Sequence, residues 1–100
     1  MILSFRSKPL RQFAGTGHPP KGDGPTRRLP VRDFERIRVL LALLDQATAP
    51  EAMNVTGLRF HALRGAPKRY SVRVTANYRL TFGWDAERGG AIDVDLEDYH

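Results

Sequence analysis

Two stretches of the chain place apolar residues at the three- and four-residue spacing of an amphipathic helix. Residues 31–48 are the clearer case, and Pro50 is positioned to end that helix. The apolar stripe consists of Phe34, Ile37, Leu41 and Leu44, widened by Leu40 and Ala47. A second, shorter helix is predicted from Lys8 to Ala14, with Leu10 and Phe13 on one face. The spacing therefore predicts two helices that each bury one side.

From Leu58 onward the hydrophobic period changes from 3.6 to 2, which is typical of half-buried strands. Four strands are predicted: Leu58–Leu63, Tyr70–Thr75, Tyr78–Trp84 and Ala91–Leu96. Residues 2–5 resemble a further short strand at the start of the chain. The connections are too short to contain crossover helices, so the sheet is expected to be mainly antiparallel. Together these elements predict an α+β fold, with a twisted sheet whose apolar face packs on the helices.

A break rich in glycine and proline separates the two predicted helices. Residues 15–30 contain four glycines and four prolines, which we expect to prevent regular structure. This segment is predicted to be a flexible, exposed loop within a single domain that spans residues 1–100. One hundred residues suffice for one domain with a modest core.

Composition changes this picture mainly through charge. The chain is 41% hydrophobic and 27% charged with a net charge of +5, so it is globular and basic. Residues 85–100 contain six acidic side chains and one arginine, which leaves about ten excess positive charges on the first 84 residues. Such a distribution favours a polyanionic partner such as nucleic acid or an acidic protein segment. No apolar run is long enough for a signal peptide or a membrane span, so we expect a cytoplasmic protein without membrane contact.

The alternation also collects polar side chains of one kind on the face of the sheet turned away from the helices. That face is predicted to display Arg59, His61, Arg73 and Arg79. The final residues, 97–100, add a carboxylate pair, a phenol and an imidazole. Cleavage of RNA without a metal requires proton transfer near neutral pH and stabilisation of a phosphorane, and these side chains supply both. An ordinary solvated face is the alternative interpretation.

Other chemistries have less support in the sequence. The histidines at 18, 61 and 100 lack the spacing of a metal site, and the chain has no cysteine. No serine lies in a nucleophile-elbow context, and Gly22-Asp23-Gly24 lacks the lysine and hydroxyl of a phosphate-binding loop. We therefore expect neither a metal nor an organic cofactor.

Four motifs in order carry a family resemblance. They are Phe60-His61-Ala62-Leu63-Arg64-Gly65, Ser71-Val72-Arg73-Val74, Asn77-Tyr78-Arg79-Leu80-Thr81-Phe82 and Glu97-Asp98-Tyr99-His100. They resemble the pattern L-H-P-L-K-G, W-S-I-x-V, N-W/Y-R-I-T-F and Y-E-D-Y-H of the HigB branch of the RelE/ParE toxin superfamily. The resemblance covers most of the chain outside residues 16–30.

This resemblance implies the toxin half of a type II toxin–antitoxin pair, acting as a ribosome-dependent mRNA endonuclease. Such toxins cut the codon in the A site of the small ribosomal subunit without a metal. The family's catalytic positions match His61, Asp98, Tyr99 and His100. Arg73 and Arg79 lie in matching strand motifs and are expected to hold the scissile phosphate or the neighbouring backbone, and Arg59 on the predicted polar face is a further RNA-binding candidate. The expected partner is a helix-turn-helix antitoxin like HigA, through which alone the toxin would reach operator DNA. Among the catalytic candidates, His100 is preferred for proton transfer, because its own terminal carboxylate should favour the protonated imidazole.

The chain departs from the family pattern at three places. The loop at residues 15–30 is longer than usual, the segment after Gly65 lacks the family's acidic residue and tryptophan, and Leu96 replaces an aromatic residue. Two alternatives for function therefore remain open at this point. One is a non-catalytic toxin of the same fold that inhibits DNA gyrase, and the other is a basic module that only binds RNA or the ribosome.

Overall fold

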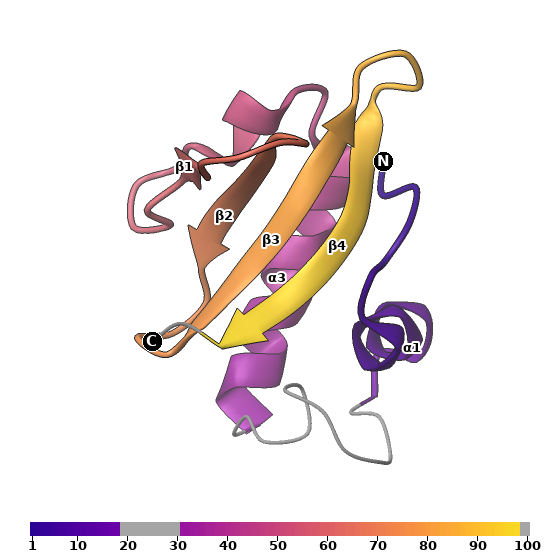
Figure 1. Cartoon of the computed structure of the whole chain (residues 1–100). Coiled ribbons are helices and arrows are strands. Elements are labelled where there is room, and N and C mark those ends of the chain that lie inside the picture. Colours follow the sequence, from indigo (N-terminus) through magenta and orange to yellow (C-terminus); the bar gives the residue numbers. More distant parts are fainter. Residues whose placement is uncertain (19–30, 99–100) are drawn as a thin grey trace.

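The computed structural model describes residues 1–18 and 31–98 and has an α+β architecture, with helices on one side of a four-stranded sheet (Figure 1). The elements in chain order are α1 (Lys8–Thr16), α3 (Val31–Gln46), a 3₁₀ helix η1 (Pro50–Met53), β1 (His61–Ala62), β2 (Arg69–Arg73), β3 (Tyr78–Asp85) and β4 (Gly90–Asp98). Within the described residues, neither α1 nor α3 has the length and apolar character needed to cross a bilayer.

The sheet is a simple meander. Its strand order is β1-β2-β3-β4 and every neighbouring pair is antiparallel, as predicted from the short connections. The N-terminal segment runs along the outer edge of β4, where Ile2 pairs with Ala91 and Phe5 with Val94 in parallel bridges. The predicted first strand at residues 2–5 is therefore reduced to two isolated bridges.

Helix α1 extends two residues beyond its predicted end. Ser7 caps its N-terminus, because the Ser7 hydroxyl accepts a hydrogen bond from the amide of Leu10. At the other end Gly17 adopts a left-handed conformation, with φ of 74°, and its amide donates to the carbonyl of Phe13. The prediction that regular structure stops before residue 15 was wrong by one half-turn, since the glycine that ends the helix is Gly17. Residues 19–30 of the predicted loop lie outside the described part of the chain.

Helix α3 packs its predicted stripe against the sheet. Every member of that stripe is buried, and the core continues into the apolar face of the strands. The shared core contains Leu10, Phe13, Phe34, Ile37, Leu40, Leu41, Leu44, Met53, Leu58, Val72, Val74, Leu80, Phe82, Ala91, Val94 and Leu96. The helix ends at Gln46, and Pro50 begins η1 instead of ending α3 directly. In Figure 1, α3 crosses behind the sheet, which leaves the opposite sheet face free of helices.

The predicted strand Leu58–Leu63 is shortened to the two residues of β1. Arg59 has φ of 51° and Gly57 has φ of 91°, so the backbone before His61 is not extended. The segment nevertheless follows β2, because the amide of Arg73 donates to the carbonyl of Leu58 at 2.6 Å. The left-handed backbone conformation of Arg59 therefore limits the length of β1, and the hydrophobic pattern does not reveal this conformation.

Candidate functional site

The strand register places polar residues side by side on the face of the sheet away from α3. Directly opposed residues on antiparallel strands point to the same face. His61 is opposite Ser71, Ser71 is opposite Thr81, and Thr81 is opposite Asp95. We call these four residues the histidine row. They cross all four strands, so the prediction that alternation brings His61 to the polar face is confirmed.

His61 is exposed, and its ring is oriented by two contacts. Its Nδ1 lies 3.1 Å from the carbonyl oxygen of Arg59, and its Nε2 lies 3.4 Å from the Ser71 hydroxyl. A carbonyl oxygen can only accept, so Nδ1 must carry the proton in this contact. In the neutral ring Nε2 is then the acceptor, and the Ser71 hydroxyl is placed to donate to it. This is the arrangement that a general base requires.

A second row lies next to the histidine row along the strands. Arg73 is opposite Arg79, and Arg79 is opposite Glu97, and we call these three residues the arginine row. Two like charges directly opposed across strands are unfavourable unless a counter-charge lies near them. Glu97 supplies one carboxylate at the β4 end, and both arginines are half-buried. The pair forms a place where an anion such as a phosphate is favourable.

A buried hydrogen-bond chain joins the strands at the centre of this face. Thr81 is only 3% exposed, and its hydroxyl accepts from Nη2 of Arg69 at 3.0 Å while donating to the carboxylate of Glu97. Nη2 of Arg69 also donates to the carbonyl of Asp93 at 2.9 Å. The polar face is therefore covered by its own side chains at its centre, and it is not the uniformly open surface that alternation alone suggests.

The charges around this chain shift two pKa values. Burial raises the pKa of Asp95, and the neighbouring Glu97 carboxylate raises it further, while the amide of Leu96 and the arginines nearby act in the opposite direction. Burial and the adjacent Arg6 lower the pKa of Arg69, which three carboxylates of β4 partly offset. Arginine stays protonated in proteins, so Arg69 remains a fixed cation among these acids.

The other predicted site residues are placed less centrally or are not described. Arg59 is exposed, two residues before His61, and contributes its carbonyl to the histidine. Asp98 is exposed at the end of β4, opposite Tyr78. Tyr78 packs against the core, so the register places Asp98 on that face of the sheet and not on the face of the arginine row. Tyr99 and His100 lie outside the described residues.

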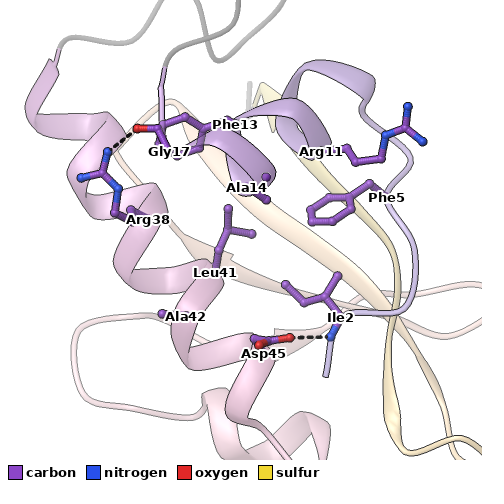
Figure 2. A pocket seen from close by; sticks show the side chains of 11 residues that line it. Ile2, Phe5, Arg11, Phe13, Ala14, Gly17, Arg38, Leu41, Ala42 and Asp45 are labelled. Carbon is purple, nitrogen blue, oxygen red and sulfur yellow. Dashed lines mark hydrogen bonds between the residues drawn. The ribbon is translucent and has the colours of Figure 1, made fainter.

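A sizeable hollow lies elsewhere, between α1, α3 and the N-terminal segment (Figure 2). It has a volume of about 560 Å³ and is lined mainly by apolar side chains, including Ile2, Phe5 and Leu41. Its polar groups are largely engaged, since Asp45 accepts from the amide of Ile2 at 3.0 Å. None of the predicted site residues lines it. Size alone therefore points away from the polar face, and the chemistry of the side chains is the better guide.

The described residues of the polar face do not form a metal-binding cluster. In residues 1–18 and 31–98, no three side chains of the types His, Cys, Asp and Glu are arranged to hold a metal ion. Two carboxylates of β4 instead accept hydrogen bonds within the protein, Glu97 from the hydroxyl of Thr81 and Asp95 from the amide of Leu96. The described groups are suited to proton transfer and to binding a phosphate.

Comparison with known proteins shows the family to which this chain belongs. The sequence model for the RelE-like toxin of the type II toxin–antitoxin system HigB matches residues 3–100. The chain belongs to this HigB-like toxin family. A relative named Endoribonuclease HigB, from Proteus vulgaris, is 34% identical over 101 aligned residues that cover both chains in full. As a type II toxin, the protein is expected by its family to have an antitoxin partner.

Sequence reasoning did not single out Arg69 and Asp95 as members of the polar face of this toxin, nor the hydrogen bond between Thr81 and Glu97. Arg69 stands one residue before the predicted second strand, and Glu97 one residue after the predicted fourth. Extending the alternation by one residue in each case would have placed both on the polar face.

Proposed function

We propose that this toxin is an endoribonuclease that cuts mRNA in the A site of the translating ribosome, without a metal ion. The family to which the chain belongs supports the toxin role, and the name of its Proteus relative supports cleavage of RNA. The basic body of the chain supports binding to an RNA backbone. Its place of action would be the cytoplasm, where ribosomes translate.

The observation that supports this proposal most strongly is the orientation of His61. Its Nδ1–H donates to the carbonyl of Arg59, so Nε2 is the proton acceptor on the face that also carries Arg73 and Arg79, where a ribose hydroxyl would replace the long contact from Ser71. A base and a pair of guanidinium groups on one sheet face are the two components that attack by a ribose hydroxyl needs.

In the proposed reaction, Nε2 of His61 takes the proton of the ribose 2′-hydroxyl, and the 2′-oxygen attacks the adjacent phosphorus. Arg73 and Arg79, with Arg59 nearby, bind the non-bridging oxygens as negative charge accumulates in the phosphorane. The bond to the 5′-oxygen then breaks, and that oxygen receives a proton. We assign this second transfer to His100, with Asp98 and Tyr99 as further catalytic residues, as the family motif suggests.

The proposed partner is a helix-turn-helix antitoxin resembling HigA, which would bind the toxin and connect it to operator DNA. A reading frame of this kind beside the toxin gene would support the pairing. Co-purification of the two proteins, followed by operator binding with and without the toxin, tests it directly.

The chemistry is tested by the ends of the cut message. Attack by the 2′-hydroxyl leaves a 2′,3′-cyclic phosphate on the upstream fragment and a 5′-hydroxyl on the downstream fragment. We expect these ends when the wild-type toxin is added to a translating extract, and no cleavage of the same message without ribosomes. His100→Ala should abolish cleavage and growth inhibition while the protein stays folded and still binds its antitoxin.

Three results would contradict the proposal. A 5′-phosphate on the downstream fragment would indicate attack by water or hydroxide and not by the ribose. Cleavage of free message at the same positions would remove the ribosome from the mechanism. Undiminished toxicity of His100→Ala, accompanied by DNA damage, would favour the inhibition of gyrase.

A further inference from the structure

Both rows of the polar face end in a carboxylate on β4. Asp95 ends the histidine row, and Glu97 ends the arginine row. The histidine lies on β1, and the two arginines lie on β2 and β3. The polar face is therefore polarised across the sheet, with the base and the phosphate-binding cations towards one edge and negative charge towards the other.

Glu97 is held between the two rows. The register places it directly opposite Arg79, and its carboxylate accepts a hydrogen bond from the Thr81 hydroxyl of the histidine row. Thr81 is only 3% exposed and accepts in turn from Nη2 of Arg69 at 3.0 Å, so the donor that holds Glu97 is itself fixed. Side chains directly opposed on one face have Cβ atoms about 5 Å apart. Glu97 therefore keeps a negative charge close to Arg79.

The adjacent carboxylate has a different orientation. Asp98 is opposite Tyr78, and Tyr78 packs against the core, so the register directs Asp98 towards the other face of the sheet. Of these two neighbouring acids at the end of β4, Glu97 is therefore the one that faces the arginine row.

A phosphate held by Arg73 and Arg79 would share its surroundings with this carboxylate. Two negative charges about 5 Å apart repel each other even where water screens them, and the expected effect on binding is about five- to tenfold. The arginine row is therefore a weaker site for a free phosphate backbone than its two guanidinium groups alone would make it.

We propose that Glu97 is a specificity-determining residue that weakens the binding of free RNA at the arginine row and so confines cleavage to message that the ribosome holds in place; this proposal rests on the function proposed above. A toxin bound to the ribosome meets the message at a high effective concentration, which offsets a weak phosphate site. Free RNA has no such help, and it experiences the full effect of the repulsion.

Glu97→Gln tests the charge, because the amide retains an oxygen that can accept from Thr81. The probe is a 2′-O-methyl RNA decamer, whose blocked 2′-oxygens prevent cleavage. Filter binding at low salt should show that Glu97→Gln binds the decamer about five- to tenfold more tightly than the wild type. The difference should disappear near 1 M salt, where the screening length falls to about 3 Å. Equal or weaker binding by Glu97→Gln at low salt would overturn the proposal.

Glu87→Gln is the matched control, because it removes the same charge at an exposed position in the turn after β3. Arg79 and the end of β3 at Asp85 are six residues apart, which is about 20 Å. Glu87→Gln and the charge-retaining Glu97→Asp should therefore bind the decamer like the wild type. Glu97→Ala also lacks the charge and should bind more tightly, which keeps the test available if Glu97→Gln does not fold. An equal gain in Glu87→Gln and Glu97→Gln would indicate a general effect of net charge and would overturn the proposal.

Cleavage assays separate this proposal from the proposed function. If the wild type cuts message on the ribosome, Glu97→Gln should raise the ratio of free-message to ribosomal cleavage about tenfold. Loss of ribosomal cleavage in Glu97→Gln with unchanged binding would make Glu97 a catalytic residue and would overturn the proposal while leaving the endonuclease intact. If the wild type cuts nothing, the endonuclease fails, and the decamer still decides whether Glu97 opposes the binding of RNA.

Discussion

At the scale of the residue, one backbone carbonyl determines what His61 can do. The contact between Nδ1 and the oxygen of Arg59 assigns the proton to Nδ1 and leaves Nε2 as the acceptor. Arg59 reaches this position through a left-handed φ of 51°, which for a residue other than glycine or asparagine is uncommon. The histidine itself was predicted from the sequence. Its tautomer could not be, because it depends on a backbone turn that no side-chain pattern indicates.

Thr81 is predicted to be the residue on which the polar face depends most for stability. Thr81→Val keeps the shape of the side chain but removes the hydroxyl that joins Arg69 to Glu97. Leaving partly buried charged groups without that partner should cost about 1–3 kcal/mol in the free energy of unfolding. Urea denaturation measures this loss. Thr56→Val, at an exposed position, is the control, and equal stability of the two variants would contradict the prediction.

Asp95 is predicted to weaken the fold when it is ionised. Because the pKa of Asp95 is raised in the folded protein, stability falls as pH rises from its ordinary pKa through the raised value. Asp95→Asn removes this cost, and the amide oxygen can still accept from the amide of Leu96. The melting temperature at pH 7 should therefore rise by a few degrees, and the gain should vanish in acid.

Asp85 provides a control of opposite sign for this pH dependence. Hydrogen bonds from the backbone and side chain of Arg88, and from the amide of Glu87, lower the pKa of Asp85 in the turn between β3 and β4. Its contribution is present above its ordinary pKa and is lost as pH falls through the lowered value. Asp85→Asn should therefore reduce stability at pH 7. A fall in stability for both variants would contradict the assigned environments.

At the scale of the element, β4 is held on both edges, and the N-terminal segment depends on it. The amide of Leu3 donates to the carbonyl of Ala91 at 2.7 Å, and the amide of Arg6 donates to Val94 at 2.8 Å. The sequence predicted β2, β3 and β4 to within two residues at each end, because their alternation is long and regular. It overestimated the length of the strands at residues 2–5 and 58–63, where the apolar runs are short and the backbone torsions decide which residues pair.

Gly90 is predicted to be essential for this N-terminal docking. A Cβ at position 90 would lie 2.7 Å from the carbonyl oxygen of Met1, which is backbone and cannot move independently. Gly90→Ala should therefore cost about 1–3 kcal/mol and release the segment, so that the amides of Leu3 and Arg6 exchange faster with solvent. Gly15→Ala, in open space within α1, should instead gain about 0.4–1 kcal/mol. Slow exchange in the Gly90 variant would contradict the account.

At the scale of the whole molecule, the helices and the polar face are separated by the sheet. The fold class followed from the sequence because the apolar stripe of α3 and the alternation of the strands specify complementary surfaces. The hollow of about 560 Å³ lies on the helix side, whereas His61 and the arginine row lie on the other face. The two sides of the molecule therefore carry different cations, and the proposed RNA site uses only those of the polar face.

Salt dependence can identify that side. If the polar face binds RNA, Arg73→Gln should reduce the slope of log binding constant against log salt concentration by about 0.7 for a single-stranded oligonucleotide. Arg11→Gln removes the same charge on the helix side, beside the large hollow of Figure 2, and should leave the slope unchanged. Filter binding at several salt concentrations measures both. Equal changes in the two variants would indicate a diffuse electrostatic surface.

The central claim is that Nε2 of His61 moves a proton during cleavage. The most direct measurement is the rate of cutting at a mapped position in a translating extract, with wild type, His61→Ala and His18→Ala compared at equal concentration. His18 is exposed two residues after the end of α1 and controls for the loss of an imidazole. We expect His61→Ala to slow cleavage by about 10²–10⁴-fold and His18→Ala to match the wild type. Equal rates for His61→Ala and the wild type would contradict the claim.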